Sequence, residues 1–382
     1  MLRPRRVFPD GQLARVKYIA QYIRKHQDEI DVIVFCELFD QRSHEYLQHV
    51  LQTSTPFRHC TARVGDDASS VAIEPTSPNS ATSSSSSSNT NAPELEEEEE
   101  EEPAQPTSFN GKPIGWRGML SRVTSYVAFM PSRLNGGVQI FSRFPLDTTE
   151  TRVFCHRVEL KGTDRLARKG FAYARITLPD PKLPHVHLVG THLQAWEDRK
   201  SVDMRLKEVA HIRRFLQGLH IPSHEPVLVA GDLNVDVIHA SDDFDDMCHV
   251  LGACDLDIRA VSTPPSPSVD NLLNNMVGRD RALRTSSEDT YARLDHCLAL
   301  EAHASALVVD KCTSTVWTDW KSPTPISMGV AGLRHTPFRR LHSHHLSDHF
   351  PVLTHVKLAT PTKPVVVVLG DVVAPVRAID RM

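Results

Sequence analysis

Short apolar runs, many of them rich in β-branched residues, alternate with longer amphipathic segments along this chain of 382 residues. Such runs predict buried strands, and apolar positions three or four residues apart predict helices with one buried face. Because strands outnumber helices and many neighbours look linked as hairpins, we expect a mixed α/β sandwich with one catalytic face. The expected helices cover 12–26 and 201–218, and the expected strands cover 31–36, 124–130, 137–141, 171–178, 186–191, 227–230, 293–299, 305–309, 350–357 and the run PVVVVLGDVV at 364–373.

Two polar segments interrupt this pattern. Residues 66–108 contain six consecutive serines and a run of seven glutamates. They bury too little apolar surface to offset the entropy lost on ordering. We therefore predict a disordered Ser/Glu-rich insertion at 66–108, within a single catalytic domain formed by residues 1–65 and 109–382. A second long loop is expected at 262–289.

Charge and cysteine content narrow the class of protein. The formal net charge is −4, but the glutamate-rich segment supplies eight negative charges, so the rest of the chain is modestly basic. No stripe of Lys and Arg with interleaved aromatics occurs, which disfavours a DNA-binding surface. The seven cysteines form no CxxC pair, which argues against a zinc cluster or a disulfide framework. No apolar stretch predicts a spanning helix, and no secretory signal is recognised after Met1.

Polar residues stand at the ends of the most apolar runs. A charge buried there without a partner costs several kcal/mol unless a metal ion or a partner group compensates it. The pattern therefore predicts a metal-dependent hydrolase. The runs are DVIVFCELFD (31–40), HLVGTHLQAW (187–196), PVLVAGDLNVD (226–236) and LSDHFPVLTHV (346–356), and their polar residues are Glu37, His192, Asp232, Asn234, Asp348 and His349.

Each of these residue types suits one part of phosphoester hydrolysis. Glu37 offers a carboxylate to a hard cation such as Mg²⁺. Asp232 and Asn234 would lie two residues apart on one face of an extended strand, where they can hold water, metal or a phosphate oxygen. Neutral His349 can take a proton from water, and His192 can donate to an oxygen that gains charge in the transition state.

Asp295 is a further candidate, because it interrupts the apolar strand YARLDHCLAL (291–300). A buried carboxylate of this kind would orient an imidazole. Each candidate also has a plainer explanation, such as an edge acid in a salt bridge, an Asx turn that ends a strand, or a solvated histidine. The joint order Glu, His, Asp-x-Asn, Asp, Asp-His favours catalysis over these separate explanations.

That order is the pattern of the endonuclease/exonuclease/phosphatase superfamily, and within it the chain most resembles the neutral, Mg²⁺-dependent sphingomyelinases of bacterial type. GGVQIFSRFPL (136–146) resembles that family's GGV-xx-S-x-x-P strand, and KGFAYARI (169–176) resembles its KGF-x-Y segment. VHLVGTHLQA (186–195) resembles its THLQA strand. The resemblance implies a DNase-I-like four-layer α/β sandwich, in which two mixed, mainly antiparallel sheets are flanked by helices.

The resemblance also implies a metal site and a set of catalytic roles. Glu37 would be the Mg²⁺ ligand, Asp348 would help to place the ion, and Mn²⁺ or Co²⁺ are alternative cofactors. His349 would be the general base. The other catalytic residues that the resemblance implies are His192, Asp232, Asn234, and the two aspartates that would orient the histidines, Asp295 and Asp348.

One departure from the family concerns its first core strand. In the family this strand precedes the helix expected here at 12–26, and it carries an Asn that helps to bind the metal. This chain starts almost directly before that helix. We therefore expect the first core strand and its Asn to be missing. Either the sequence is a truncated form, or the protein has a defective sheet and a weakened metal site.

The implied function is a phosphodiesterase that hydrolyses sphingomyelin, or a related phosphosphingolipid, to ceramide and a phosphorylated headgroup. The alternatives are a DNase-like nuclease of the same superfamily and a catalytically impaired, truncated binding homologue. An inositol-phosphate phosphatase is disfavoured because GDLNVD has no arginine after its Asn. We expect a monomer that meets its substrate in a membrane surface and binds no nucleic acid. It would be peripheral to a membrane, or secreted if a signal peptide precedes Met1.

Trp317 and Trp320 are candidates for membrane contact. In the resembling family, this interval of the chain holds a protruding hairpin with exposed aromatics that rests in the bilayer surface. Tryptophan favours the headgroup region, and nearby cations such as Lys321 attract anionic lipid. The alternative is that both tryptophans cap the core.

Overall fold

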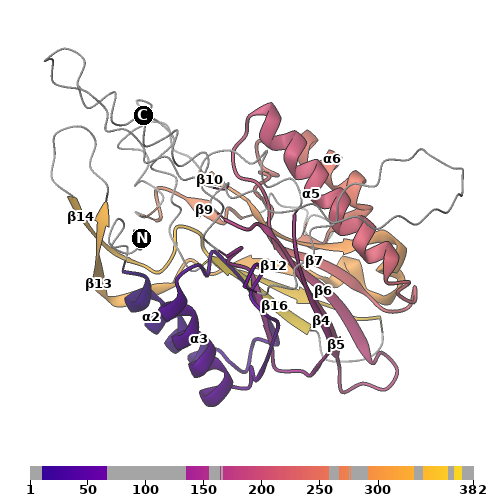
Figure 1. Ribbon diagram of the computed structural model, residues 1–382, viewed down its shortest axis with the longest axis horizontal. Coiled ribbons are helices and arrows are strands. Elements are labelled where there is room, and N and C mark those ends of the chain that lie inside the picture. The colour runs from indigo at the N-terminus through magenta and orange to yellow at the C-terminus, as the bar shows by residue number, and fades with distance from the viewer. Residues whose placement is uncertain are drawn as a thin grey trace, which may run out of the picture. The chain divides into compact units, whose positions relative to one another are not determined.

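Two six-stranded sheets form the centre of the computed structural model (Figure 1). The expected strand at 124–130, and all of the expected insertion except Asp66, lie outside the residues that the structure describes. The described residues are 11–66, 135–154, 164, 167–257, 266–274, 276, 291–330, 339–359 and 365–371.

The first sheet has the strand order β12-β15-β16-β1-β3-β2. Strand β1 pairs in parallel with β16, whereas all other neighbours in this sheet are antiparallel. Strands β2 and β3 lie on either side of the glutamate-rich segment in the sequence and pair with each other, so the chain leaves and re-enters the sheet at adjacent positions. The strands are β1 (Val32–Cys36), β2 (His59–Cys60), β3 (Gln139–Ser142), β12 (Thr313–Val316), β15 (Val352–Val356) and β16 (Val365–Asp371).

The second sheet has the order β4-β5-β6-β7-β11-β8. Strands β6 and β7 are parallel and the other pairs are antiparallel. A parallel pair needs a crossover connection, and helix α5 (Arg199–Gly218) provides it. The strands are β4 (Leu146–Val153), β5 (Gly170–Thr177), β6 (His185–His192), β7 (Val227–Asp232), β8 (Ala253–Asp255) and β11 (Asp295–Leu300).

Strand β1 illustrates how the sequence produces the layers. Successive side chains of a strand point to opposite faces of its sheet. Val32, Val34 and Cys36 therefore join the core between the two sheets. Ile33 and Phe35 join a second core under the helices. All five side chains are buried, which is why this strand is a continuous apolar run rather than an alternating one.

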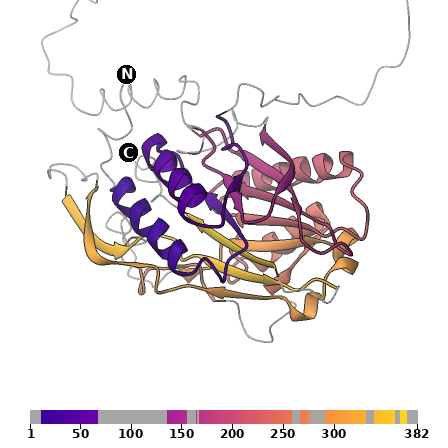
Figure 2. The ribbon, with the colours of Figure 1, turned by 90° about the horizontal axis from the view of Figure 1, so that it is seen from below.

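Helices cover the outer face of each sheet. Helices α2 (Gln12–Lys25) and α3 (Gln41–Ser54) pack on the first sheet, and α5 and α6 (Ser241–Leu251) pack on the second. Figures 1 and 2 show the two helix pairs on opposite sides of the sheets. The resulting order of helix, sheet, sheet and helix is the four-layer α/β sandwich expected from the sequence. None of the described helices is long and apolar enough to cross a bilayer.

Strand β16 occupies the position beside β1 from which the first core strand was expected to be missing. A strand that preceded α2 would reach β1 through a helical crossover, and would therefore lie parallel to β1. Strand β1 has two neighbours, and the parallel one is β16. Asp31 fixes this strand at its other end, because its backbone N–H donates to the carbonyl of Val366 and its carboxylate accepts from the N–H of Val366, each over 3.0 Å. The sheet is continuous at this position.

Most expected elements are present within a few residues of their predicted bounds. The expected strand at 305–309 is wrong: this region forms the short 3₁₀ helices η5 (Glu301–Ala306) and η6 (Val309–Lys311). Two hairpin-like pairs complete the described structure. They are β9 (Val269–Asp270) with β10 (Tyr291–Ala292), and β13 (Lys321–Val330) with β14 (Arg339–His345).

Candidate active site

The register of the second sheet sets three of the candidate residues in one row. His192 pairs with Asp232 across the parallel strands β6 and β7. Asp232 in turn pairs with Asp295 across the antiparallel strands β7 and β11. The Nε2 atom of His192 lies 3.4 Å from an oxygen of Asp232, and all three side chains are buried. Three segments far apart in the sequence therefore place their polar ends at one edge of the sheet.

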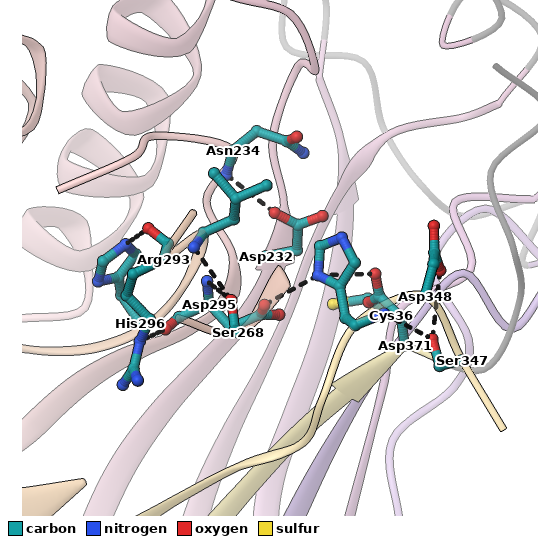
Figure 3. A network of polar contacts seen from close by, with 12 residues as sticks. Cys36, Asp232, Asn234, Ser268, Arg293, Asp295, His296, Ser347, Asp348 and Asp371 are labelled. Carbon is teal, nitrogen blue, oxygen red and sulfur yellow. Dashed lines mark hydrogen bonds and ion pairs between the residues drawn. The ribbon is translucent and has the colours of Figure 1, made fainter. Parts of the chain in front are cut away.

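The first sheet brings a second group of residues to the same place. Asp371, at the end of β16, pairs with Cys36 at the end of β1. The thiol of Cys36 donates to the carbonyl of Thr191 over 3.5 Å, which joins the two sheets next to His192. Figure 3 shows the carboxylates of Asp232, Asp295 and Asp371 gathered in this region.

His349 lies between these two groups of side chains. It belongs to the segment just before β15, which begins at Val352. Its Nδ1 atom is 2.8 Å from Asp295 Oδ2 and 3.5 Å from Asp371 Oδ2. The imidazole is 4% exposed. Burial disfavours the charged ring, but the Asp295 and Asp371 carboxylates outweigh it and raise the pKa of His349 well above its usual value. The Nδ1 atom is committed to a carboxylate, so Nε2 is the ring nitrogen that can exchange a proton with water.

Asp371 is the least compensated carboxylate of this group. Its side chain is 4% exposed, and its Oδ1 atom is buried without a hydrogen-bond partner. Burial, together with the nearby charges of Asp232, Asp295 and Glu37, raises the pKa of Asp371 well above its usual value although His349 opposes this. One ligand atom each from Asp232, His349 and Asp371 lies within 4.8 Å of the others, a spacing that could hold a metal ion.

Two candidate residues have a left-handed backbone. The φ angle is 55° at Glu37 and 53° at Asn234. Side chains other than glycine rarely adopt this conformation, and it is concentrated at functional sites. The sequence suggested that Asn234 lies on an extended strand, but its backbone conformation shows that it does not. Strand β7 ends at Asp232, whose carboxylate accepts from the Asn234 N–H over 2.9 Å, and the Asn234 amide donates to the carbonyl of Leu193 over 3.1 Å.

Gly231 allows β7 to approach β6 at the site. A Cβ atom at this position would lie 1.9 Å from the carbonyl oxygen of Thr191, and the φ angle of 143° strains any other residue. The glycine in GDLNVD is therefore required for the parallel pairing that places Asp232 beside His192.

Asp348 and the two tryptophans lie apart from the grouped carboxylates. In Figure 3, Asp348 stands on the far side of Asp371 from Asp232, and the Ser347 hydroxyl contacts its carboxylate at 3.3 Å. Neither Asp348 nor Glu37 belongs to the group of described residues whose ligand atoms all lie within 4.8 Å of one another, which consists of Asp232, His349 and Asp371. Trp320 is 4% exposed, and its ring lies 4.6 Å from that of Tyr22 on α2. This burial favours the core-packing alternative for Trp320 over contact with a membrane.

Trp317 is partly buried on the same core. Its ring lies 5.5 Å from that of Tyr22 and 5.2 Å from that of His26. The two tryptophans therefore pack the segment between β12 and β13 against helix α2.

Asp371 is the site residue that sequence reasoning missed. The run VVVVLGD (365–371) was expected to form a strand, but its terminal aspartate was not considered as a site residue. A signal was present, because VLVAGD (227–232) has the same form: apolar residues followed by Gly-Asp. In both cases the aspartate closes a buried strand at the same end of the two sheets.

The sequence pattern of the Endonuclease/Exonuclease/phosphatase family matches residues 9–349. This match spans most of the chain, and the protein belongs to that family. Among curated relatives, Sphingomyelinase C 2 of Leptospira interrogans is 28% identical over 262 residues, which are 65% of this chain and 35% of the relative. The chain thus spans about a third of the length of this relative.

Solved structures support the same fold. Sphingomyelinase C from Streptomyces griseocarneus superposes with a TM-score of 0.61 at 20% identity, over 92% of this chain and 94% of the other. A variant of beta toxin from Staphylococcus aureus, solved with bound magnesium ions, superposes with a TM-score of 0.59 at 20% identity, over 91% and 93% of the two chains. At this identity the superpositions establish the fold, which is the DNase-I-like sandwich.

Proposed function

We propose that the protein is a divalent-metal-dependent phosphodiesterase that hydrolyses sphingomyelin, or a related phosphosphingolipid, to ceramide and a phosphorylated headgroup. The observation that carries the proposal is the buried His349–Asp295 pair. Asp295 lies in the same row of the second sheet as Asp232 and His192, and His349 approaches this row from the side of the first sheet. The relative named as a sphingomyelinase gives the substrate class, and the motifs THLQA and KGF-x-Y support it.

The donor set of the site suits a hard cation. Mg²⁺ prefers carboxylate oxygens with water and substrate phosphate as its other ligands. The buried oxygen of Asp371 without a hydrogen-bond partner is the kind of atom that a cation would satisfy. Glu37 and Asp232 are the further carboxylates that would hold the ion, and the beta toxin structure with bound magnesium ions supports Mg²⁺ as the metal. When bound, the cation would offset charge on the phosphate oxygens and oppose the carboxylates that raise the pKa of His349.

The chain's own residues would then act on water and on the phosphodiester. Asp295 holds the Nδ1 atom of His349, so that Nε2 can accept the proton of the attacking water. Asp232 and Asn234 would orient this water or a phosphate oxygen. His192, beside Asp232, would donate to the oxygen that gains negative charge. The water attacks phosphorus in line with the departing ceramide oxygen, and the bond to that oxygen breaks.

We further propose that the protein acts as a monomer, peripheral to the membrane surface that contains its substrate. In the resembling family, lipid contact comes from the interval of the chain that contains the β13–β14 hairpin here. The described part of this hairpin is therefore the element proposed to meet the membrane. Because Trp320 is buried, any lipid contact of this segment would come from other side chains of the hairpin.

The proposal is tested with the purified chain on sphingomyelin liposomes. We expect release of the phosphorylated headgroup with Mg²⁺ and none with EDTA, and no cleavage of plasmid DNA under the same conditions. Asp295→Asn is the informative variant, and Asp255→Asn is its matched control. Asp255 is also a buried carboxylate paired with an imidazole, His296, but outside this site, with its Oδ2 atom 3.1 Å from the ring Nδ1 atom. Cleavage of DNA without cleavage of sphingomyelin would overturn the proposal.

A further inference from the structure

Strand β16 takes a place that chain order does not suggest. It lies between β15 and β1, and it is parallel to β1. This is the place that a strand leading into helix α2 would occupy, because a crossover through α2 would make it parallel to β1. The last described strand in the sequence thus fills the position beside β1.

The position of Asp371 follows from this pairing. The register places it opposite Cys36, so its side chain emerges next to the residue that precedes Glu37. In Figure 3 its carboxylate lies among those of the site, between Asp232 on one side and Asp348 on the other. The side chain is 4% exposed, and the Oδ1 atom has no hydrogen-bond partner.

The charges around Asp371 are unbalanced. Asp232 and Asp295 lie in the same buried group, and Glu37 is close enough to act on Asp371 electrostatically. The imidazole of His349 is shared, but its nearer partner is Asp295 at 2.8 Å, whereas Asp371 is at 3.5 Å. Buried carboxylates at this spacing repel one another unless positive charge lies between them.

We propose that Asp371 is a direct ligand of the divalent cation, so that strand β16, which lies beside β1, contributes a carboxylate to the metal site. This rests on the proposed function in so far as that function needs a cation. An aspartate supplies an anionic oxygen where an asparagine supplies a neutral one, and hard cations bind anionic oxygens more tightly.

The affinity of the purified chain for Mn²⁺, measured by electron paramagnetic resonance without substrate, tests this proposal. Asp371→Ala should raise the Kd for Mn²⁺ by at least about tenfold, since even outer contacts of a metal site cost about that much. Asp371→Asn keeps one neutral oxygen donor and should fall between the wild type and the alanine variant. Gly370→Ala is the matched control, because a Cβ there meets only Pro351 at ordinary contact distance, and it should bind Mn²⁺ like the wild type.

Thermal unfolding gives a second readout that a merely structural role would not produce. Without metal, Asp371→Asn removes one of several repelling carboxylates, so its Tm should rise above that of the wild type. With saturating Mg²⁺, the wild type should gain more stability than the variant, and the order of the two Tm values should reverse. This variant is close in shape to the native residue, so the test stands even if Asp371→Ala does not fold.

Glu37→Gln shows whether both carboxylates hold the same ion. If they do, the double variant with Asp371→Asn should lose less Mn²⁺ affinity than the sum of the two single losses in free energy. An unchanged Kd in both Asp371 variants would overturn the proposal, as would a Tm that falls equally with and without Mg²⁺. Neither the Kd for Mn²⁺ nor the Tm depends on turnover. The proposed function is therefore tested separately, by the hydrolysis of sphingomyelin.

Discussion

The Nδ1 atom of His349, just before β15 of the first sheet, lies 2.8 Å from Oδ2 of Asp295, the first residue of β11 in the second sheet. The pair is buried, and Asp295 also accepts from the hydroxyl of Ser268. Burial alone would raise the pKa of Asp295, but His349 lowers it below its usual value. The pair therefore fixes both the orientation of the imidazole and the nitrogen that faces the reaction.

Asp295→Asn should lower kcat for sphingomyelin by roughly 10²-fold or more, because the amide no longer stabilises the proton on Nδ1 or the charged ring. His349→Ala should lower it by at least as much, roughly 10²–10⁴-fold. Circular dichroism of both variants should match the wild type. More than a tenth of the wild-type kcat in His349→Ala would remove this residue from the role of general base.

Asp31 anchors β16 at the end away from the site. Its carboxylate accepts from the Val366 N–H over 3.0 Å and pairs with Arg143 over 3.2 Å. Asp31→Ala leaves a buried N–H without its acceptor, and should lower the free energy of unfolding by roughly 1–3 kcal/mol. Asp31→Asn retains the acceptor and should lose less. Chemical denaturation measures both, and equal losses would show that the hydrogen bond to β16 contributes little.

Trp320 should contribute to the fold rather than to lipid binding. Replacement of this buried ring by Ala should cost roughly 3–5 kcal/mol, whereas Trp317→Ala should cost less because Trp317 is only partly buried. At a temperature where the variants stay folded, their relative activities should be the same on sphingomyelin liposomes and on a soluble phosphodiester. A selective loss on liposomes would restore the membrane interpretation.

Glu208 on α5 predicts a dependence of stability on pH. Burial raises its pKa from 4.5 to about 7, although Lys169 and the Gln194 N–H oppose this. Between these values the carboxyl ionises only in the unfolded chain, so this group increasingly destabilises the fold as pH rises from about 4.5 to about 7, and its penalty is constant above that. The shift corresponds to roughly 3 kcal/mol at most.

Glu208→Gln removes this titration. We expect its stability relative to the wild type to be greater at pH 8 than at pH 4.5, as measured by denaturant unfolding at both pH values. Glu197→Gln, at an exposed position of the preceding loop, is the control and should give the same difference at both. A constant difference for Glu208→Gln would mean that folding does not shift the pKa of this carboxyl.

The local pattern was sufficient to predict much of the fold. Continuous apolar runs such as 31–36 and 227–230 could be read as buried strands because both faces of each sheet are covered. Helix α2 was recognised from its apolar spacing. Helices α3 and α6 were missed, because each buries a narrow stripe of side chains within an otherwise polar segment.

The sequence by itself determined which polar residues end the buried strands, because a charge at such a place must be compensated. Glu37, His192, Asp232 and Asp295 could be named from their positions in apolar runs, without knowledge of any interatomic distance. Only the tertiary structure decided which of them meet, since Asp295 and His349 approach each other through the packing of two sheets. It also decided that β16 pairs with β1 and brings Asp371 into the site, because strand order depends on long-range pairing that local periodicity does not encode.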